Sequence, residues 1–173
     1  MDISIDRKPI GRIVYECFAD ICPRTSENFR ALCTGERSSA ETGQRLHYKG
    51  STIHAVYSDW AIVGGDIINR NGTSGASIYG RFFNDENFTL HHDRPGLLSM
   101  MSFKNNTNNS QFVVSMKAAP SMDGQNVVFG QVVHGMDVVE RIARCGNEFG
   151  LLPNQVVIAD CGELVNINQR GDL

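Results

Sequence analysis

The pattern of apolar and polar positions predicts mostly β-structure. Ile3 and Ile5 alternate with polar neighbours, a turn follows, and alternation resumes over residues 10–17. A period of two is typical of strands with one buried face, so these residues are expected to form a hairpin. Further short strands are expected at residues 51–54 and 61–64, and a fully buried strand is expected at residues 156–159.

The stretch from residue 97 to residue 130 is expected to hold three more strands around a groove. An apolar run opens the stretch, and the next strand places Phe112 and Val114 on one face and Gln111 and Val113 on the other. We interpret the polar Gln111, which lies between two loops, as one wall of an open groove.

Two segments change to the helical period. Phe29, Leu32 and Cys33 fall at positions i, i+3 and i+4, which predicts an amphipathic helix over residues 23–34. A second helix is expected over residues 136–143. Eight short strands with only two helices favour an all-β fold, a closed eight-stranded antiparallel barrel capped by the two helices.

Polar stretches between these elements predict loops. Residues 36–46 are expected to form a surface loop, and residues 69–87, with three glycines and no period, a long ordered loop. A length of 173 residues with 41% apolar and 20% charged residues is typical of one compact domain, here residues 1–173.

Charge and hydropathy narrow the classes of partner and compartment. The formal net charge is −3 and no basic block occurs, which argues against nucleic acid as a partner. No apolar run approaches the roughly 20 residues that span a bilayer, so no membrane association is expected. The first residues lack the basic and apolar regions of a signal peptide, so we expect a cytoplasmic protein. We also expect the protein to be a monomer.

The five cysteines and five histidines lack the spacing of a metal site. Cys17 and Cys22 are separated by four residues without a second ligand pair, and Cys145 stands alone. No nucleotide-binding loop or hydrolase elbow occurs either. Neither a metal nor an organic cofactor is therefore expected.

Several blocks of sequence closely resemble the cyclophilins, the cyclosporin-binding class of peptidyl-prolyl cis-trans isomerases. The resemblance covers essentially the whole chain, in order. It implies the same barrel, with proline-containing peptides or proteins as clients and isomerase (rotamase) activity in protein folding. The blocks are residues 27–36 (ENFRALCTGE), 48–51 (YKGS), 64–66 (GGD), 71–73 (NGT), 77–80 (SIYG), 85–88 (DENF) and 127–130 (VVFG).

The chain departs from this family where catalysis is expected. In cyclophilins an arginine directly after a histidine donates a hydrogen bond to the imide nitrogen, and a glutamine eight residues later orients it. Here His54 is retained, but Ala55 and Val63 occupy the other two positions. Removal of one preorganised donor costs roughly 10²–10³ in rate, so strongly impaired catalysis is expected.

The resemblance also implies a peptide groove with altered packing. Trp60 and Met122 replace a phenylalanine and a leucine with comparable bulk, whereas Val113 and Ala61 are smaller than the usual residues. Phe103 belongs to a strip that is usually small, and it could block the groove or fold under its own loop. The implied groove consists of His54, Ala55, Trp60, Ala61, Val63, Met101, Ser102, Phe103, Gln111, Val113, Ser121, Met122 and Asn126.

Two further implications of the resemblance concern a drug and a redox pair. Ala55, Val113 and Ser121 stand where cyclosporin contacts are usual, so weak or no cyclosporin binding is expected. The long segment 37–47 resembles the divergent-loop subgroup, in which cysteines at the positions of Cys33 and Cys161 pair in some members. The alternative is two reduced, buried thiols.

Three functions therefore compete: an isomerase of altered efficiency, a non-catalytic peptide-binding or scaffold module, and a redox-responsive scaffold. Separate measurements of X-Pro exchange, peptide binding and thiol content under oxidant would distinguish them.

Overall fold

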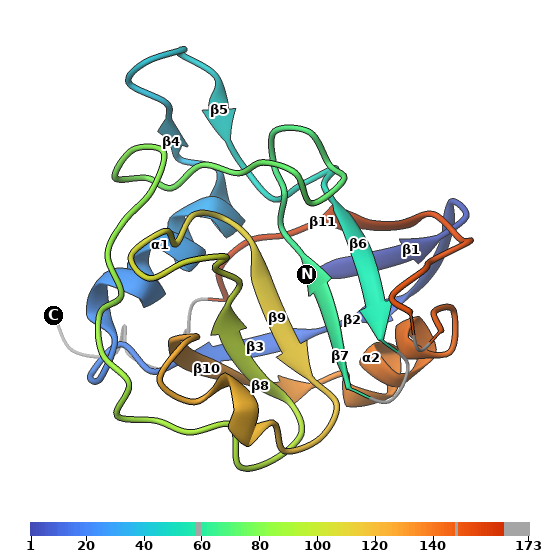
Figure 1. Cartoon of the computed structure of the whole chain (residues 1–173). Coiled ribbons are helices and arrows are strands. Elements are labelled where there is room, and N and C mark those ends of the chain that lie inside the picture. Colours follow the sequence, from blue (N-terminus) through green and yellow to red (C-terminus); the bar gives the residue numbers. More distant parts are fainter. Residues whose placement is uncertain (58–59, 148, 165–173) are drawn as a thin grey trace, which may run out of the picture.

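The computed structural model describes residues 1–57, 60–147 and 149–164, and Figure 1 shows the path of the chain. The described elements are β1 (Asp2–Ile5), β2 (Lys8–Arg12), β3 (Val14–Cys17), α1 (Pro23–Thr34), β4 (Arg37–Ser38), β5 (Arg45–Leu46), β6 (Thr52–Tyr57), β7 (Ala61–Gly64), β8 (Leu97–Met100), β9 (Phe112–Ser115), the 3₁₀ turn η1 (Pro120–Met122), β10 (Val128–His134), α2 (Met136–Ala143) and β11 (Val156–Asp160).

Nine of these strands form one antiparallel sheet in the order β2-β1-β11-β6-β7-β9-β8-β10-β3. The strands at its two ends, β2 and β3, are separated in the chain only by Ile13. The N–H of Ile13 donates to the Met1 carbonyl oxygen (2.9 Å), and its own carbonyl accepts from the Met1 nitrogen (2.8 Å). One continuous segment therefore pairs first with β1 and then with β10, which nearly closes the sheet into a barrel.

The predicted all-β class and the barrel with two helices are confirmed. Nine strand ranges occur instead of eight because the segment that contains β2 and β3 changes partner at Ile13. Figure 1 shows α1 and α2 on opposite sides of the barrel. Both helices have the predicted bounds. The described chain contains no helix that is long and apolar enough to cross a membrane.

Helix α1 begins at Pro23 and ends before Gly35, which adopts the left-handed conformation (φ 65°) and donates its N–H to the Ala31 carbonyl. Proline fits the first helical position because its missing N–H would have no partner there. The Glu86 carboxylate, from a distant loop, accepts from the N–H of Thr25 (2.8 Å) and from its hydroxyl (2.7 Å). The loop is thus attached to the start of the helix.

The barrel core is built around aromatic side chains. The ring centroid of Phe29 on α1 lies 5.3–5.6 Å from those of Tyr15, Tyr48, Phe112 and Phe129, distances typical of attractive edge contacts. On β9, Phe112 and Val114 join this core, and Val113 faces the opposite side. The predicted alternation along β9 is confirmed.

Two local predictions are corrected. Residues 156–159 were expected to be fully buried, but on β11 Val157 is half-buried and Ala159 is exposed. An antiparallel strand at the barrel surface has one face toward solvent, which a short apolar run does not reveal. The expected loop 36–46 contains the short β4–β5 pair, and its Leu46 is buried. The long loop 69–87 has no strand, as predicted.

The described residues contribute to one barrel with one principal core. The predicted single domain covers residues 1–173, and its last nine residues lie outside the described part.

Candidate functional site

A second apolar cluster lies outside the principal core, on β7, β9 and the turn η1. We call it the outer cluster; it consists of Ala61, Val63, Val113, Ala119 and Met122, with Ala55, Tyr57, Trp60 and Met101 packed against it. Seven of these nine residues belong to the groove that the sequence implies. The structure therefore gathers just over half of the expected groove positions in one apolar cluster.

The strand register fixes the middle of the outer cluster. Ala55 on β6 is paired with Val63 on β7, and Val63 is paired with Val113 on β9. Directly opposite residues on antiparallel strands have Cβ atoms about 4.5–5.5 Å apart. The three side chains thus form a row across three strands, and none of them can donate a hydrogen bond.

Gln111 does not form an exposed wall, contrary to our interpretation of its position. It is 1% exposed, and its amide nitrogen donates to the carbonyls of Gly72 (3.0 Å) and Ser74 (2.6 Å). Alternation correctly assigns Gln111 to the Val113 face, but a loop covers that face at this point. The side chain holds the loop and does not present its amide to solvent.

His54 lies beneath the same loop. A Cβ atom added to Gly72 would lie 2.5 Å from Cδ2 of the imidazole, so only glycine allows this close approach. The buried Nδ1 has no hydrogen-bond partner among the described residues. Burial lowers the pKa of His54, which favours the neutral ring.

Asp66 organises this loop, and our sequence analysis did not single it out. Its buried carboxylate accepts hydrogen bonds from the backbone N–H groups of Ile68, Asn69, Asn71, Gly72 and Ser74. Burial alone would raise the pKa of Asp66, but these donors lower it overall. The aspartate in the Gly-Gly-Asp block, followed by a loop rich in asparagine and glycine, was the available signal.

The remaining groove positions lie at the margin of the outer cluster. Phe103 is 70% exposed, so it does not fold under its own loop. Ser102 is half-buried and Ser121 is exposed. The amide of Asn126 donates to the Met100 carbonyl (2.9 Å), which uses its donor for the fold.

Trp60 is the largest side chain packed against the outer cluster. It is half-buried, and its ring lies edge-on to Tyr57 with the centroids 5.5 Å apart. A partly exposed aromatic ring beside small apolar side chains is suited to contact a proline ring or another apolar side chain.

Cys33 and Cys161 lie away from the outer cluster, where both line a cavity beside α1. All five cysteines are free thiols. Burial raises the pKa of Cys161 to about 11 and also raises that of Cys33. The described residues contain no group of three His, Cys, Asp or Glu side chains that could hold a metal ion.

The architecture is that of a small antiparallel barrel with two helices, and a second apolar cluster lies outside its principal core. The family described as "Cyclophilin type peptidyl-prolyl cis-trans isomerase/CLD" matches residues 1–163. The chain therefore belongs to the cyclophilin-type peptidyl-prolyl cis-trans isomerase family.

Proposed function

We propose that this cyclophilin binds X-Pro peptide segments at the outer cluster and catalyses their isomerisation only weakly. The observation that carries the proposal is the apolar row formed by Ala55, Val63 and Val113. In the family the first two positions hold the donor arginine and its orienting glutamine.

The chemistry explains why this row matters. Rotation about a peptide bond crosses a barrier of about 18–20 kcal/mol because the C–N bond has partial double-bond character. A catalyst accelerates rotation only by interactions that are stronger at the barrier top than in the ground state. A methyl group at Ala55 can exclude water but cannot donate to the imide nitrogen, so binding persists while the main electrostatic contribution is lost.

Exchange NMR on a short X-Pro peptide tests this proposal. We expect chemical-shift changes in the peptide and in the Trp60 indole, with cis–trans exchange at least about 10²-fold slower than with a cyclophilin that retains the arginine. A Trp60→Ala variant should weaken binding, because it removes the partly exposed ring packed against the outer cluster; Phe149→Ala, which removes an exposed ring outside that cluster, is the matched control. Exchange acceleration equal to that of the reference cyclophilin would refute impaired catalysis.

The second candidate function is a non-catalytic, redox-responsive scaffold. The observation in its favour is that Cys33 and Cys161 line the same cavity. A disulfide there would connect the end of α1 with the segment after β11. We keep a monomeric, cytoplasmic protein without a cofactor and with weak cyclosporin binding as part of both proposals.

A further inference from the structure

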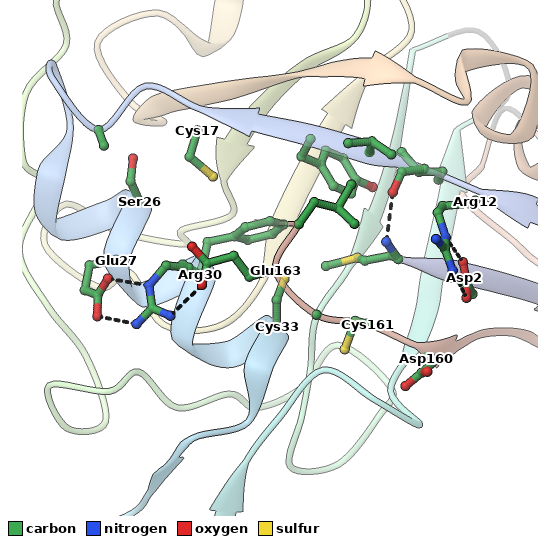
Figure 2. A pocket seen from close by; sticks show the side chains of 18 of the residues that line it. Asp2, Arg12, Cys17, Ser26, Glu27, Arg30, Cys33, Asp160, Cys161 and Glu163 are labelled. Carbon is green, nitrogen blue, oxygen red and sulfur yellow. Dashed lines mark hydrogen bonds and ion pairs between the residues drawn. The ribbon is translucent and has the colours of Figure 1, made fainter. Parts of the chain in front are cut away.

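The centre of the outer cluster is covered by other groups. Ala61 and Val113 are each 1% exposed and Val63 is 4% exposed, although all three lie outside the principal core. Small side chains on a sheet become buried only where something lies over them. A peptide must therefore displace this cover before it reaches these residues. The cavity beside α1 (Figure 2) shares no residue with the outer cluster and is a separate feature.

The strand register places Met101 among the covering groups. Met100 on β8 is opposite Phe112 on β9, and both belong to the principal core. Side chains alternate along a strand, so Met101 lies on the same side of the sheet as Val113. The N–H of Met101 donates to the Gln111 carbonyl (3.0 Å), which makes Val113 its diagonal neighbour. Such neighbours are about 7–8 Å apart, within reach of a long side chain.

The contacts of Met101 fit this position. Its side chain is half-buried and packs against the outer cluster. The preceding Met100, by contrast, is 0% exposed in the principal core. The two neighbouring methionines thus serve opposite faces of the same sheet, and only Met101 lies at the candidate binding site.

The backbone near Met101 is fixed, whereas its side chain is able to move. The N–H of Met100 donates to the Val127 carbonyl (2.9 Å), and the carbonyl of Met100 accepts from the Asn126 amide (2.9 Å). A methionine side chain is unbranched and has three rotatable bonds, so it adapts more easily than a branched or aromatic one. It can leave the outer cluster without any change in the strands.

We infer that Met101 is a movable cover over the outer cluster and that an X-Pro segment binds only after this side chain has moved aside. The inference rests on the proposed function, because it concerns access to the same site. The apparent affinity of such a site is its intrinsic affinity multiplied by the fraction of molecules that are open. Met101 therefore lowers the affinity, whereas a residue that contacts the peptide would raise it.

The test compares wild type with Met101→Ala by calorimetry, with acetyl-Ala-Ala-Pro-Ala-amide as the probe. A cover that is in place in about nine molecules of ten lowers affinity about tenfold, so the variant should bind about tenfold more tightly. Met101→Leu keeps the bulk and should gain no affinity. Met136→Ala is the matched control, because Met136 is also half-buried but packs against the principal core.

The binding kinetics distinguish a cover from a peptide contact. Stopped-flow fluorescence of Trp60, the single tryptophan of the chain, reports both rates. In Met101→Ala the association rate should rise about tenfold, because every molecule is open, and the dissociation rate should stay the same. A faster dissociation rate without faster association would show that Met101 contacts the peptide, and would overturn the inference.

A measurement without peptide tests the cover by itself. The soluble nitroxide TEMPOL broadens the NMR signals of methyl groups that solvent can approach. Met101→Ala should increase the broadening of the Val63 and Val113 methyl signals and leave that of Val114, in the principal core, unchanged. Met136→Ala should leave the broadening of Val63 and Val113 as it is in wild type.

The outcomes separate this inference from the proposed function. Equal or weaker peptide binding by Met101→Ala would overturn the cover and leave the proposed function intact, and so would unchanged broadening of Val63 and Val113. Failure of both wild type and Met101→Ala to bind the probe would refute the proposed function, and with it the role of Met101 in peptide access.

Discussion

Ala55 on β6 lies directly opposite Val63 on β7. This pairing couples the two replacements that the sequence places at the family's donor and its orienting residue. Because the two side chains are neighbours across one strand pair, the proposed loss of the donor and the proposed loss of its support would form one structural change. Restoring only the arginine at position 55, or only the glutamine at position 63, should therefore leave its partner missing.

We predict that Ala55→Arg alone restores little activity. Without a glutamine at position 63 the guanidinium has no orienting partner, and a misplacement of about 1 Å can itself cost about 10²-fold. The triple variant Ala55→Arg, Val63→Gln, Val113→Phe should recover substantially more, in a strongly non-additive way. The measurement is kcat/KM on a succinyl-Ala-Xaa-Pro-Phe peptide. Near-complete rescue by the single change would show that only the donor was missing.

Cyclosporin should bind several kcal/mol more weakly than it binds a cyclophilin with the usual contacts. Aromatic and arginine anchors commonly cost about 2 kcal/mol or more each when they are removed, and here the positions hold Ala55, Val113 and Ser121. Val113 is buried and Ser121 is exposed, so neither replaces the lost aromatic contact area. Titration calorimetry checks this prediction, and a nanomolar complex would contradict it.

The Asp66 carboxylate should make stability depend on pH in the acid range. Its folded pKa lies below the ordinary value of 3.8, so its contribution is present above that pH and is lost as the pH falls through the folded pKa. Asp66→Asn should lower the free energy of unfolding by about 2–4 kcal/mol at neutral pH, through weaker bonds to the loop. Urea unfolding near neutrality and in acid measures both effects. The difference in the free energy of unfolding between wild type and Asp66→Asn should become smaller in acid. A difference that does not change with pH would show that the ionised Asp66 carboxylate is not its cause.

Oxidation of Cys33 and Cys161, if they form a pair, should be slow at neutral pH. The thiolate is the reactive species, and burial raises the pKa of both thiols. We expect the rate of thiol loss to rise about tenfold per pH unit between about pH 7 and pH 9. Thiol counting should show two groups lost in wild type and in Cys145→Ser, but not in Cys33→Ser. Loss of two groups in Cys33→Ser would assign the bond to other cysteines.

Helix-end signals and strand alternation predicted those parts of the fold that depend on residues close together in the sequence. The bounds of α1 follow from Pro23 and Gly35, because each changes the backbone within one turn. The faces of β9 follow from period two, which assigned Phe112 and Val113 to opposite sides correctly.

Contacts between distant segments were the part that could not be predicted. Gln111 was assigned to the correct face, but the loop that buries it is held by Asp66, and neither periodicity nor composition indicates that cover. The same limit applies to Ile13, whose position between two strand partners depends on where β1 and β10 lie. The row formed by Ala55 and Val63 became visible only in the strand register.

The pairing of β1 with β11 has a consequence for folding kinetics. Asp2 lies opposite Asp160, so the barrel closes only when nearly the whole described chain is available. Contacts between residues so far apart in sequence carry a large loop-closure entropy, and folding rates fall as such contacts predominate. During synthesis, β6 would remain an open sheet edge until Val156 and Val157 emerge from the ribosome. Chaperone protection of that edge should therefore matter most in the last stage of translation.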